Sequence, residues 1–520
     1  MFKHGVYVSE QATSIGTPVV AGSGIPFVVG AAPVNRAENP AKAGIPVLCT
    51  SWSEAVDKLG YSDDWKKYTL CEFMYSHFRL FQCQPVIFLN VLDTEKMVAK
   101  VQNAAATAED HKFSLTGDAI AATLKVEVEV PANIVTPNAG AGTQIEDEGE
   151  TIADDDIDAD ADADVTIPDD DTDDSGITEN VTLVKGTDYD TYYDGEELIV
   201  ELLAESEYYG KTAFSVSYSK VDPSKVELAD IADGIEGIEL CLTTLGMIPD
   251  LICAPGYSHN SVIAATMSAK ADSVSGLFRA KALIDIDSSA TGARSYDAVY
   301  QAKIDANLVS ANEIICWPCV KLGDYQFHLS TQLAGLMAQV DSGNDGTPYE
   351  SPSNKNLQID GACLEDGTEI ALTHTQANIL NGNGIVTALN FMGGWVAWGN
   401  NTACYPTNTD VKDYHIPIAR MFAWVGNTLV QTFWSRLDKP MNRRLLDTII
   451  NSANIWLDGL VGSGYLLGAR VEMLDEENPL TNLMQGIVKL HIYMTPPSAA
   501  QEIDFVLEYD PQYVTAALTE

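Results

Sequence analysis

Short apolar segments that alternate with helical stretches are the feature that most restricts how this chain can fold. A continuous apolar run is typical of a strand that is buried on both faces. Strands of this kind that alternate with helices predict βαβ units and a partly parallel sheet. The sequence therefore predicts a mixed α/β (α+β) fold. The segments are GIPFVVGAA at 24–32, PVIFLNVLD at 85–93, PDLICAPG at 249–256, KALIDID at 281–287 and NEIICWPCV at 312–320.

Helical periodicity is clear in three places. Segments 51–60 and 67–81 are expected to be helices between the first two buried strands. The longest helical signal lies within 411–470, where apolar residues recur every three or four positions and form one face. Asp438 and Pro440 are expected to mark its start, as a capping residue and an early-turn proline. The apolar face consists of Leu446, Ile449, Ile450, Ala453, Trp456, Leu457 and Leu460.

The pattern changes between residues 101 and 225. Apolar and polar residues alternate strictly over 124–130, and several strand-like segments follow. This predicts a small antiparallel β domain with one wet face. The segment YDTYYDG at 189–195 is expected to be a turn between two of its strands. Because strand–helix alternation resumes afterwards, we interpret the domain as an insertion.

More than half of the formal net charge of −44 belongs to this insertion. Residues 101–225 hold 31 Asp and Glu against 6 Lys, a net of −25 that leaves −19 for the rest of the chain. Segment 146–174 alone has 16 acids and no Lys or Arg, so a flexible, solvated, outward-facing segment is expected. Nucleic acid and anionic membrane surfaces are not expected partners, since both require clustered cations.

The chain is expected to be made in a cytosol. Its N-terminus lacks the basic start and apolar stretch of a signal peptide, and no run of about 18 apolar residues occurs. The nine cysteines are odd in number, scattered and set in apolar surroundings, which indicates reduced, buried thiols.

No catalytic or ligand-binding motif is complete. The eight histidines are far apart, and no glycine-rich segment completes a nucleotide-binding loop. Cys316 and Cys319 form a CxxC pair, but it ends a strand-like segment instead of opening a helix, which favours a structural role. Alternating aspartates at 158–164 resemble part of a calcium loop without its glycine and final glutamate. We therefore expect no catalytic residue, cofactor or metal site, while weak cation binding by the acidic segment stays open.

Both ends of the chain have strand-like segments. Val6 and Val8 alternate with Tyr7 near the start. Near the end, Ile503, Phe505 and Leu507 fall on one face of EIDFVLEYD. A terminal strand of this kind can add to the edge of a neighbour's sheet. The pattern equally allows the second strand to complete the chain's own sheet.

The sequence resembles the tail sheath proteins of contractile bacteriophages and related contractile injection systems. The resemblance covers roughly 1–100 and 230–520, in family order, and omits 101–225. It begins at HGVYVSE, where His4 replaces the family's usual Pro. The similar segments are HGVYVSE at 4–10, GIPFVVGAAP at 24–33, PVLCTSWSEAVDKLG at 46–60, GGWVAWGNNTA at 393–403, RRLLDTIINSANIW at 443–456, GARVEML at 468–474 and GIVKLHIYMTPPSAAQEIDFVLEY at 486–509.

The resemblance implies a structural subunit, not an enzyme. Such subunits stack as rings or a helix around an inner tail tube, linked by strand exchange of their terminal arms, and contract to drive the tube through a cell envelope. The implied partners are copies of the chain, the tube protein, and baseplate and terminator proteins; the implied location is a virion tail assembled in a bacterial cytoplasm. The candidate linking residues are Gly5, Val6, Tyr7, Val8, Ile503, Phe505 and Leu507, and the candidate tube contact is Lys439, Arg443 and Arg444.

Five parts are expected on this interpretation. The α/β sheath domain is split by the insertion, and the C-terminal domain is expected to face the tube. The parts are an arm at 1–20, the sheath domain at 21–100 and 226–380, the acidic β domain at 101–225, the C-terminal domain at 381–495, and a strand and arm at 496–520.

Two other classes of protein remain as alternatives. The first is a large cytosolic α/β enzyme with an acidic inserted domain, for which the Cys316 and Cys319 thiols are the candidate reactive groups. The second is a surface-layer or capsid lattice protein, and the missing signal peptide weighs against the surface layer.

Overall fold

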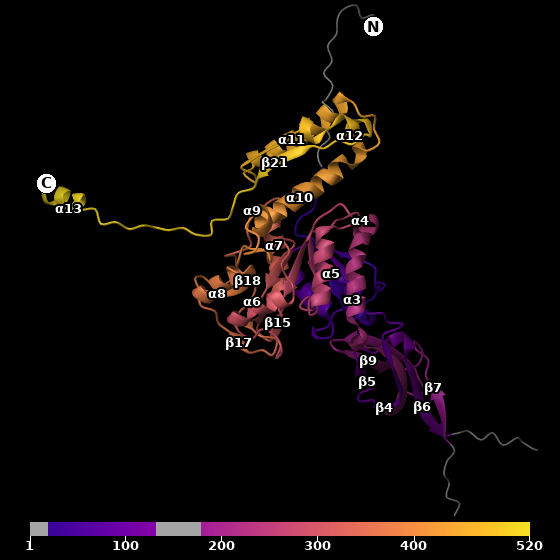
Figure 1. The fold of residues 1–520 in the computed structure, drawn as a ribbon. Coiled ribbons are helices and arrows are strands. Elements are labelled where there is room, and N and C mark those ends of the chain that lie inside the picture. Colours follow the sequence, from indigo (N-terminus) through magenta and orange to yellow (C-terminus); the bar gives the residue numbers. More distant parts are fainter. Residues whose placement is uncertain (1–18, 132–177, 520) are drawn as a thin grey trace, which may run out of the picture. The chain divides into compact units, whose positions relative to one another are not determined.

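The computed structural model describes residues 19–131 and 178–519 (Figure 1). The chain divides into two compact units, of which the first comprises Met1–Ala99 with Val221–Glu520 and the second Lys100–Lys220. The second unit lies within the predicted insertion at 101–225, apart from its first residue.

The first unit is built on an eight-stranded sheet with the order β19-β18-β13-β12-β11-β1-β3-β2. The six inner strands are parallel, and β2 and β19 are antiparallel edges. The predicted mixed α/β fold class is therefore confirmed. The strands are β1 (Pro26–Gly30), β2 (Val47–Cys49), β3 (Val86–Asn90), β11 (Leu251–Cys253), β12 (Lys281–Asp285), β13 (Glu313–Cys316), β18 (Ile385–Asn390) and β19 (Trp395–Trp398).

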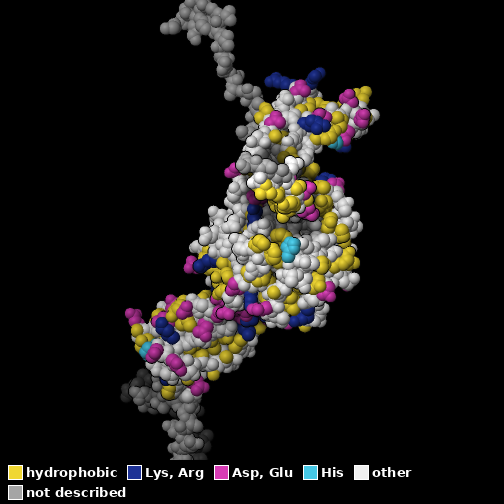
Figure 2. Space-filling view, turned by 90° about the vertical axis from the view of Figure 1, so that its left-hand side faces the viewer, with side chains coloured by type: hydrophobic (Ala, Val, Ile, Leu, Met, Phe, Trp, Pro, Cys, Tyr) yellow, Lys and Arg dark blue, Asp and Glu magenta, His cyan; other side chains and the backbone are white. Residues whose placement is uncertain are grey.

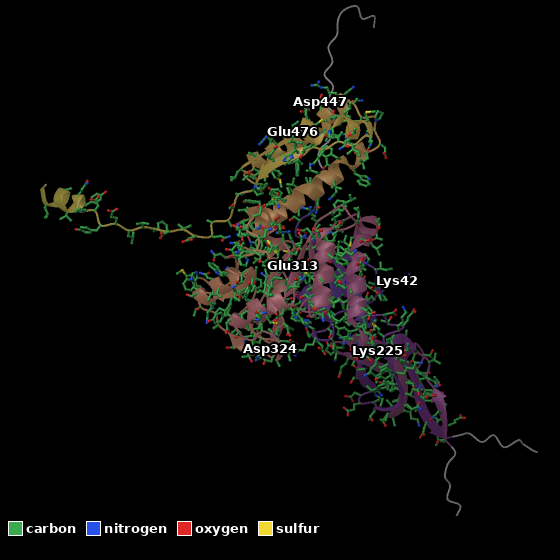
Figure 3. All side chains as sticks on the ribbon, in the orientation of Figure 1. Lys42, Lys225, Glu313, Asp324, Asp447 and Glu476 are labelled. Atoms are coloured by element: carbon green, nitrogen blue, oxygen red, sulfur yellow. The ribbon has the colours of Figure 1, made fainter. Side chains whose placement is uncertain are left out.

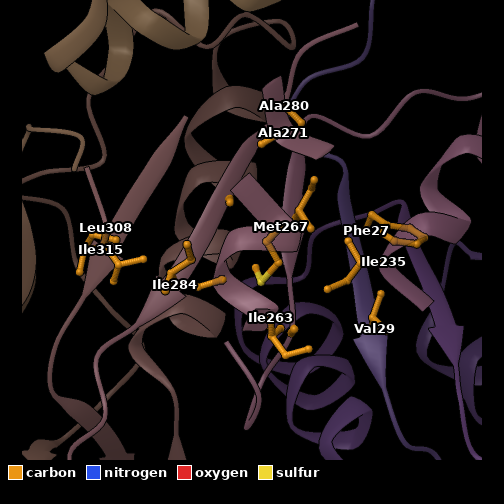
Figure 4. Packing of buried hydrophobic residues seen from close by; sticks show 14 of the residues in the cluster. Phe27, Val29, Ile235, Ile263, Met267, Ala271, Ala280, Ile284, Leu308 and Ile315 are labelled. Carbon is orange, nitrogen blue, oxygen red and sulfur yellow. The ribbon is translucent and has the colours of Figure 1, made fainter. Parts of the chain in front are cut away.

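Every residue of β1, β3, β11, β12 and β13 is buried. This explains why the sequence shows continuous apolar runs there and not alternation. Figure 4 shows side chains of α5 and of α3 facing the strands, among them Met267 and Ile235. The helices of this region are α1 (Trp52–Leu59), α2 (Thr69–Met74), α3 (Leu228–Glu236), α4 (Leu240–Leu245), α5 (Ser261–Asp272), α6 (Tyr296–Asp305), α7 (Leu329–Gly343) and α8 (His374–Asn381).

The sheet extends beyond the boundary predicted at residue 380. Strand β18 pairs in parallel with β13, and β19 pairs with β18. Strands β18 and β19 therefore belong to the large sheet, although they lie after residue 380. A separate four-stranded antiparallel sheet follows β13, in the order β15-β14-β16-β17. Its strands are β14 (Cys319–Leu322), β15 (Tyr325–Phe327), β16 (Gly361–Cys363) and β17 (Glu369–Ile370).

The second unit consists of two sheets, β4-β10-β6-β7 and β5-β9-β8. The expected turn at 189–195 is wrong, because Tyr189–Asp194 is the strand β8 and only Gly195 and Glu196 make the turn to β9. Threonine and tyrosine favour strands, which outweighs the turn preference of Asp and Gly here. The strands are β4 (Val98–Thr107), β5 (Lys112–Thr116), β6 (Lys125–Pro131), β7 (Thr178–Thr182), β8, β9 (Glu197–Leu202) and β10 (Ala213–Val221).

The C-terminal region contains two long helices and a β-hairpin. The predicted apolar face of α11 is confirmed, with Ala453, Leu457 and Leu460 buried. Its predicted start is wrong, since Asn442 and not Asp438 caps the helix by accepting the Leu445 N–H at 2.9 Å. The elements are α9 (Val411–Tyr414), α10 (Ile416–Phe433), α11 (Arg443–Gly462), β20 (Gly468–Glu472), α12 (Leu480–Met484), β21 (His491–Thr495) and α13 (Gln512–Thr519).

One π-helix and six short 3-10 helices are the remaining helical elements of the described residues. The second half of the predicted helix at 67–81 is a π-helix, η2 (Tyr75–Phe81). The 3-10 turns are η1 (Val34–Arg36), η3 (Ala121–Thr123), η4 (Pro223–Lys225), η5 (Gly237–Glu239), η6 (Trp434–Arg436) and η7 (Asp475–Glu477).

Candidate assembly interfaces

The segment 502–510, predicted to be a strand, has no strand partner in the part of the chain that the structure describes. Figure 1 shows it as an extended trace between β21 and α13. Its apolar side chains are exposed: Phe505 is 82% and Leu507 94% accessible, and Ile503 is similar. The alternative in which this segment completes the chain's own sheet is therefore not what the described residues show. A row of exposed large apolar residues marks an interaction surface.

Helix α13, which follows this segment, is also exposed. Tyr513, Val514 and Leu518 lie within about 140° on one side of the helix at 100° per residue. Leu518 is 81% accessible. Segment 502–510 and α13 are therefore two consecutive elements whose apolar side chains no described part of the chain covers.

Strands β20 and β21 form a two-stranded antiparallel hairpin in the same region. A two-stranded sheet is marginal by itself in water. Here it is stabilised by packing on α10 and α11, where Val471 joins a buried cluster with Trp424 and Leu457. The hairpin has two outer edges, one along β20 and one along β21.

The two edges are not equivalent. The Asn454 side chain, from α11, accepts the Val471 N–H at 2.8 Å and donates to the Val471 carbonyl at 3.3 Å. These are the bonds that a further strand would make beside β20. No corresponding side chain bonds the outer edge of β21 among the described residues.

The four N-terminal linking residues predicted from the sequence, Gly5, Val6, Tyr7 and Val8, lie outside the described residues. The described chain begins against α10. The Val19 and Ala21 N–H groups donate to the hydroxyls of Thr432 and Thr428, both at 3.1 Å. The indole of Trp424 donates to the Ala21 carbonyl at 2.9 Å. The end of the predicted N-terminal arm at 1–20 and the residue after it are thus held against the C-terminal region.

A buried charge network, which sequence reasoning missed, joins α10 to the large sheet. The Arg420 guanidinium donates to Asp341 at the end of α7 and, at 2.9 Å, to Asp250 before β11. Asp250 also accepts the Ile25 N–H at 2.7 Å. Burial raises the pKa of the Asp250 carboxyl, and the nearby Arg420 guanidinium only partly offsets this rise. Burial acts to lower the pKa of Arg420, but the Asp341 and Asp250 carboxylates outweigh it, so that pKa is raised. The three charges lie too far apart in the sequence for any spacing to indicate them.

The three basic residues predicted as a tube contact lie at or just before the start of α11. Lys439, Arg443 and Arg444 are all exposed, and Arg443 reaches only Asp447, at 3.7 Å. Asp447 is labelled at the upper end of the region in Figure 3, and Figure 2 shows dark-blue Lys and Arg side chains at that end. The exposed side chains of Trp434, Leu437 and Met441 precede them.

A pocket of about 570 Å³ lies at the carboxyl ends of β12 and β13. Open α/β sheets bind ligands at such ends, so this pocket is where the enzyme alternative would place its site. Cys316 and Cys319 line it. Burial raises the pKa of both thiols well above the usual range, which disfavours the reactive thiolate.

The polar groups of this pocket mainly bond to one another. Glu72 accepts the backbone N–H of His328 at 2.7 Å and contacts its Nδ1 at 2.8 Å. Burial alone would lower the pKa of His328, but the Glu72 carboxylate outweighs it and the pKa rises to about 9. Asp285 accepts from the Ser258 hydroxyl at 3.0 Å and from the Ser330 N–H at 3.0 Å. The bonds of Glu72 tie the start of α7 to α2, and those of Asp285 tie it to the end of β12.

Residues 19–131 and 178–519 contain neither a cluster of metal-binding side chains nor a membrane-spanning helix. In that part of the chain, no three His, Cys, Asp or Glu side chains are grouped so that they could hold a metal ion. None of the described helices is both long enough and apolar enough to span a bilayer. The acidic segment 146–174, left open as a weak cation site, lies outside the described residues.

Together, the split α/β domain, the inserted β unit and the uncovered C-terminal elements define a class: a multidomain subunit with surfaces suited to assembly. Comparison with known proteins identifies its relatives. No protein-family model matches the sequence. The tail sheath protein of Burkholderia phage BcepMu is 26% identical over 359 residues, which cover 66% of this chain and 73% of that protein. The major tail sheath protein of Serratia phage KSP20 is 25% identical over 35% of this chain and 45% of its own length.

A solved structure shares the fold across nearly the whole chain. The anti-feeding prophage helical sheath in its contracted state has a TM-score of 0.53, with 13% identity over 98% of this chain and all of that one. The expected relationship is thereby confirmed: the chain is a homologue of phage tail sheath proteins.

Proposed function

We propose that this chain polymerises around an inner tail tube and contracts to drive the tube through a target envelope. Its homologues are tail sheath proteins, so the class of function is that of a structural subunit of a contractile tail. The observation that carries the proposal is the uncovered segment 502–519 in a region that also offers an open sheet edge. In a homologue of sheath proteins, these two features supply a donor and an acceptor for strand exchange between copies.

The linkage proceeds by addition of terminal arms to the β20–β21 hairpin of neighbouring copies. Adding strands to a two-stranded sheet satisfies its edge groups and buries the apolar residues of the arm. The C-terminal arm supplies Ile503, Phe505 and Leu507, and the N-terminal arm supplies Gly5, Val6, Tyr7 and Val8. The bonds of Val19 and Ala21 support the role of the second arm, because they hold the chain on α10 beside the same region.

The tube contact is made by Lys439, Arg443 and Arg444. All three side chains are exposed, and among the described residues the one ion pair given for them, between Arg443 and Asp447, is long at 3.7 Å. Their charges therefore remain available to an acidic partner surface. The inserted unit, with segment 146–174, faces outward, away from the tube. Baseplate and terminator proteins bind the two ends of the sheath, and the particle is a virion tail assembled in a bacterial cytoplasm.

Catalysis has no part in this proposal. The raised pKa values of Cys316 and Cys319 support a packing role for both. Electron microscopy of the purified protein, alone and with its tube, tests the proposal against the enzyme alternative. Hollow cylinders are the expected result. A protein that stays monomeric or dimeric at all concentrations, with or without the tube, would overturn it.

A further inference from the structure

A small cavity lies between α10 and the parts of the chain that lead into β12 and β13. Its volume is about 70 Å³, which is room for about two water molecules. Ala419, Phe422 and Ala423 of α10 form an apolar wall of this cavity. A space of this size accommodates one small ion and excludes larger ligands.

The charged residues that line the cavity are mostly cations. Arg279, Lys281 and Lys412 line it, together with the single acid Asp413. The whole chain has the opposite balance, with 74 Asp and Glu against 30 Lys and Arg. Because Lys412 and Asp413 pair with each other, the charges of Arg279 and Lys281 have no acid left among the residues that line the cavity. Two cations that share a small space repel each other unless an anion lies between them.

The ammonium group of Lys281, the first residue of β12, is the buried part of this cavity. The residue is only 5% accessible. Its Nζ donates to the Ala311 carbonyl at 2.8 Å and to Asn312 Oδ1 at 3.0 Å, and both acceptors are uncharged. An ammonium has three hydrogens to donate, so one remains. A buried cation without an anionic partner is costly, and an anion in the cavity would supply that partner.

Arg279 is held in place at the exposed side of the cavity. Its backbone N–H donates to Asn427 Oδ1 on α10 at 2.9 Å, and its carbonyl accepts from the Asn427 amide at 2.9 Å. Arg279 and Lys412 are exposed, whereas Lys281 is buried. Since exposed and buried cations line the same space, an ion from solvent can reach the Lys281 ammonium.

We propose that this cavity binds one tetrahedral oxyanion with the size and charge of sulfate or inorganic phosphate. The ion accepts the remaining hydrogen of the Lys281 ammonium and pairs with the Arg279 guanidinium. Because Lys281 belongs to β12 and the apolar wall belongs to α10, the bound ion strengthens the attachment of α10 to the large sheet. The site is independent of the proposed function.

Calorimetric titration of the purified full-length chain with sodium sulfate tests the site. At pH 6 and constant ionic strength in sodium chloride, we expect saturable binding of one sulfate per chain. Lys281→Met should weaken this binding at least about tenfold, because it removes a charged hydrogen-bond donor. Arg279→Gln should weaken it about threefold, since that side chain is exposed. The control Lys42→Gln, at an exposed lysine that does not line the cavity, should leave the affinity unchanged.

The pH dependence of sulfate binding tests the contribution of Lys281. Burial lowers the pKa of Lys281 to about 7, and the neighbouring Arg279 lowers it further, so the ammonium loses its charge as pH rises through this value. Sulfate keeps its charge over this range. The affinity of the wild-type chain should therefore fall at least about tenfold between pH 6 and pH 9. The affinity of Lys281→Met should stay constant.

The other charged or titratable groups near Lys281 do not give the same profile. They are Arg279, Arg420, Lys412, Asp413 and Cys404. Arginines stay charged at these pH values. Burial would raise the pKa of Asp413, but bonds from Lys412 and Asn408 lower it, and burial raises the pKa of Cys404. A loss of affinity that disappears in Lys281→Met therefore belongs to Lys281.

Three results would overturn the inference. They are the absence of saturable sulfate binding at pH 6, an affinity that is the same in Arg279→Gln as in Lys42→Gln, and a wild-type affinity that does not change between pH 6 and pH 9. Arg279→Gln keeps the test decisive if Lys281→Met does not fold. Neither measurement requires sheath formation, so failure of the proposed function would leave this inference standing.

Discussion

The eight-stranded sheet and segment 502–519 are both rich in apolar residues, but only the sheet buries them within the chain. All residues of β1 and β3 are buried, whereas Phe505 and Leu507 are almost fully exposed. Burial of a Leu or Phe side chain is worth about 1.5–3 kcal/mol. The sheet has this stabilisation in a single copy, and on the proposed function the segment gains it from a partner. Folding and assembly would then depend on separate parts of the sequence.

The strongest test of this separation is Phe505→Asp. We expect a complete loss of sheath formation with no change in the free energy of unfolding, because the side chain contributes nothing to the single copy. Negative-stain microscopy and urea unfolding measure the two quantities. Sheaths of ordinary length would contradict the strand-exchange role, and a large loss of stability would contradict the separation.

The opposite behaviour is expected of Arg420→Ala. It leaves Asp250 and Asp341 buried without their cation, and losing one partner of a buried pair costs about 3–5 kcal/mol. The loss should appear in urea unfolding of the single copy. Arg436→Ala, at a half-buried arginine in η6, is the control and should change stability by less than about 0.5 kcal/mol.

His328 should make stability depend on pH. Its folded pKa, about 9, exceeds the unfolded value of about 6.5, so its contribution is complete below pH 6.5 and is lost as pH rises through 9. The stability difference between wild type and His328→Gln should therefore fall by about 2–4 kcal/mol between pH 6 and pH 10. The variant is compared with wild type at each pH because Lys281, whose pKa burial lowers to about 7, also changes its charge in this pH range. A constant difference would contradict the ion pair with Glu72.

A smaller effect, confined to assembly, is expected of Arg443→Glu with Arg444→Glu. Both side chains are exposed, so the free energy of unfolding should change by less than about 0.5 kcal/mol. Sheaths on tubes should become shorter or fewer. Normal sheath length on tubes would remove these residues from the proposed contact.

Deletion of 146–174 should have the smallest effect. It removes 16 of the 74 acids and lies in the region that the resemblance to sheath proteins omits. Sheath formation, measured as before, should be unchanged. Loss of assembly would make this segment an interface.

The sequence predicted those parts of the fold that depend on local pattern. Continuous apolar runs located β1, β3, β11, β12 and β13, and three- and four-residue spacing located α11. The extent of the sheet was missed because β18 and β19 join it from a region judged separate. The Arg420 network was missed because it depends on three charges that only the folded chain brings together. The exposed arm was foreseen as one of two possibilities, since alternation alone does not say which sheet a strand joins.

The six residues 496–501 join β21 to the segment that, on the proposed function, a copy donates. The ring of His415, at the start of α10, contacts the Ala499 N–H at 3.3 Å and the Gln501 amide at 3.0 Å, which holds this connection to its own copy. In a polymer linked in this way, pulling force passes from one hairpin through six residues to the next hairpin. The force in such a polymer would be carried by the hairpins and residues 496–501, and not by the large sheet. Each α/β domain could then change its orientation while the length of this connection stays nearly constant.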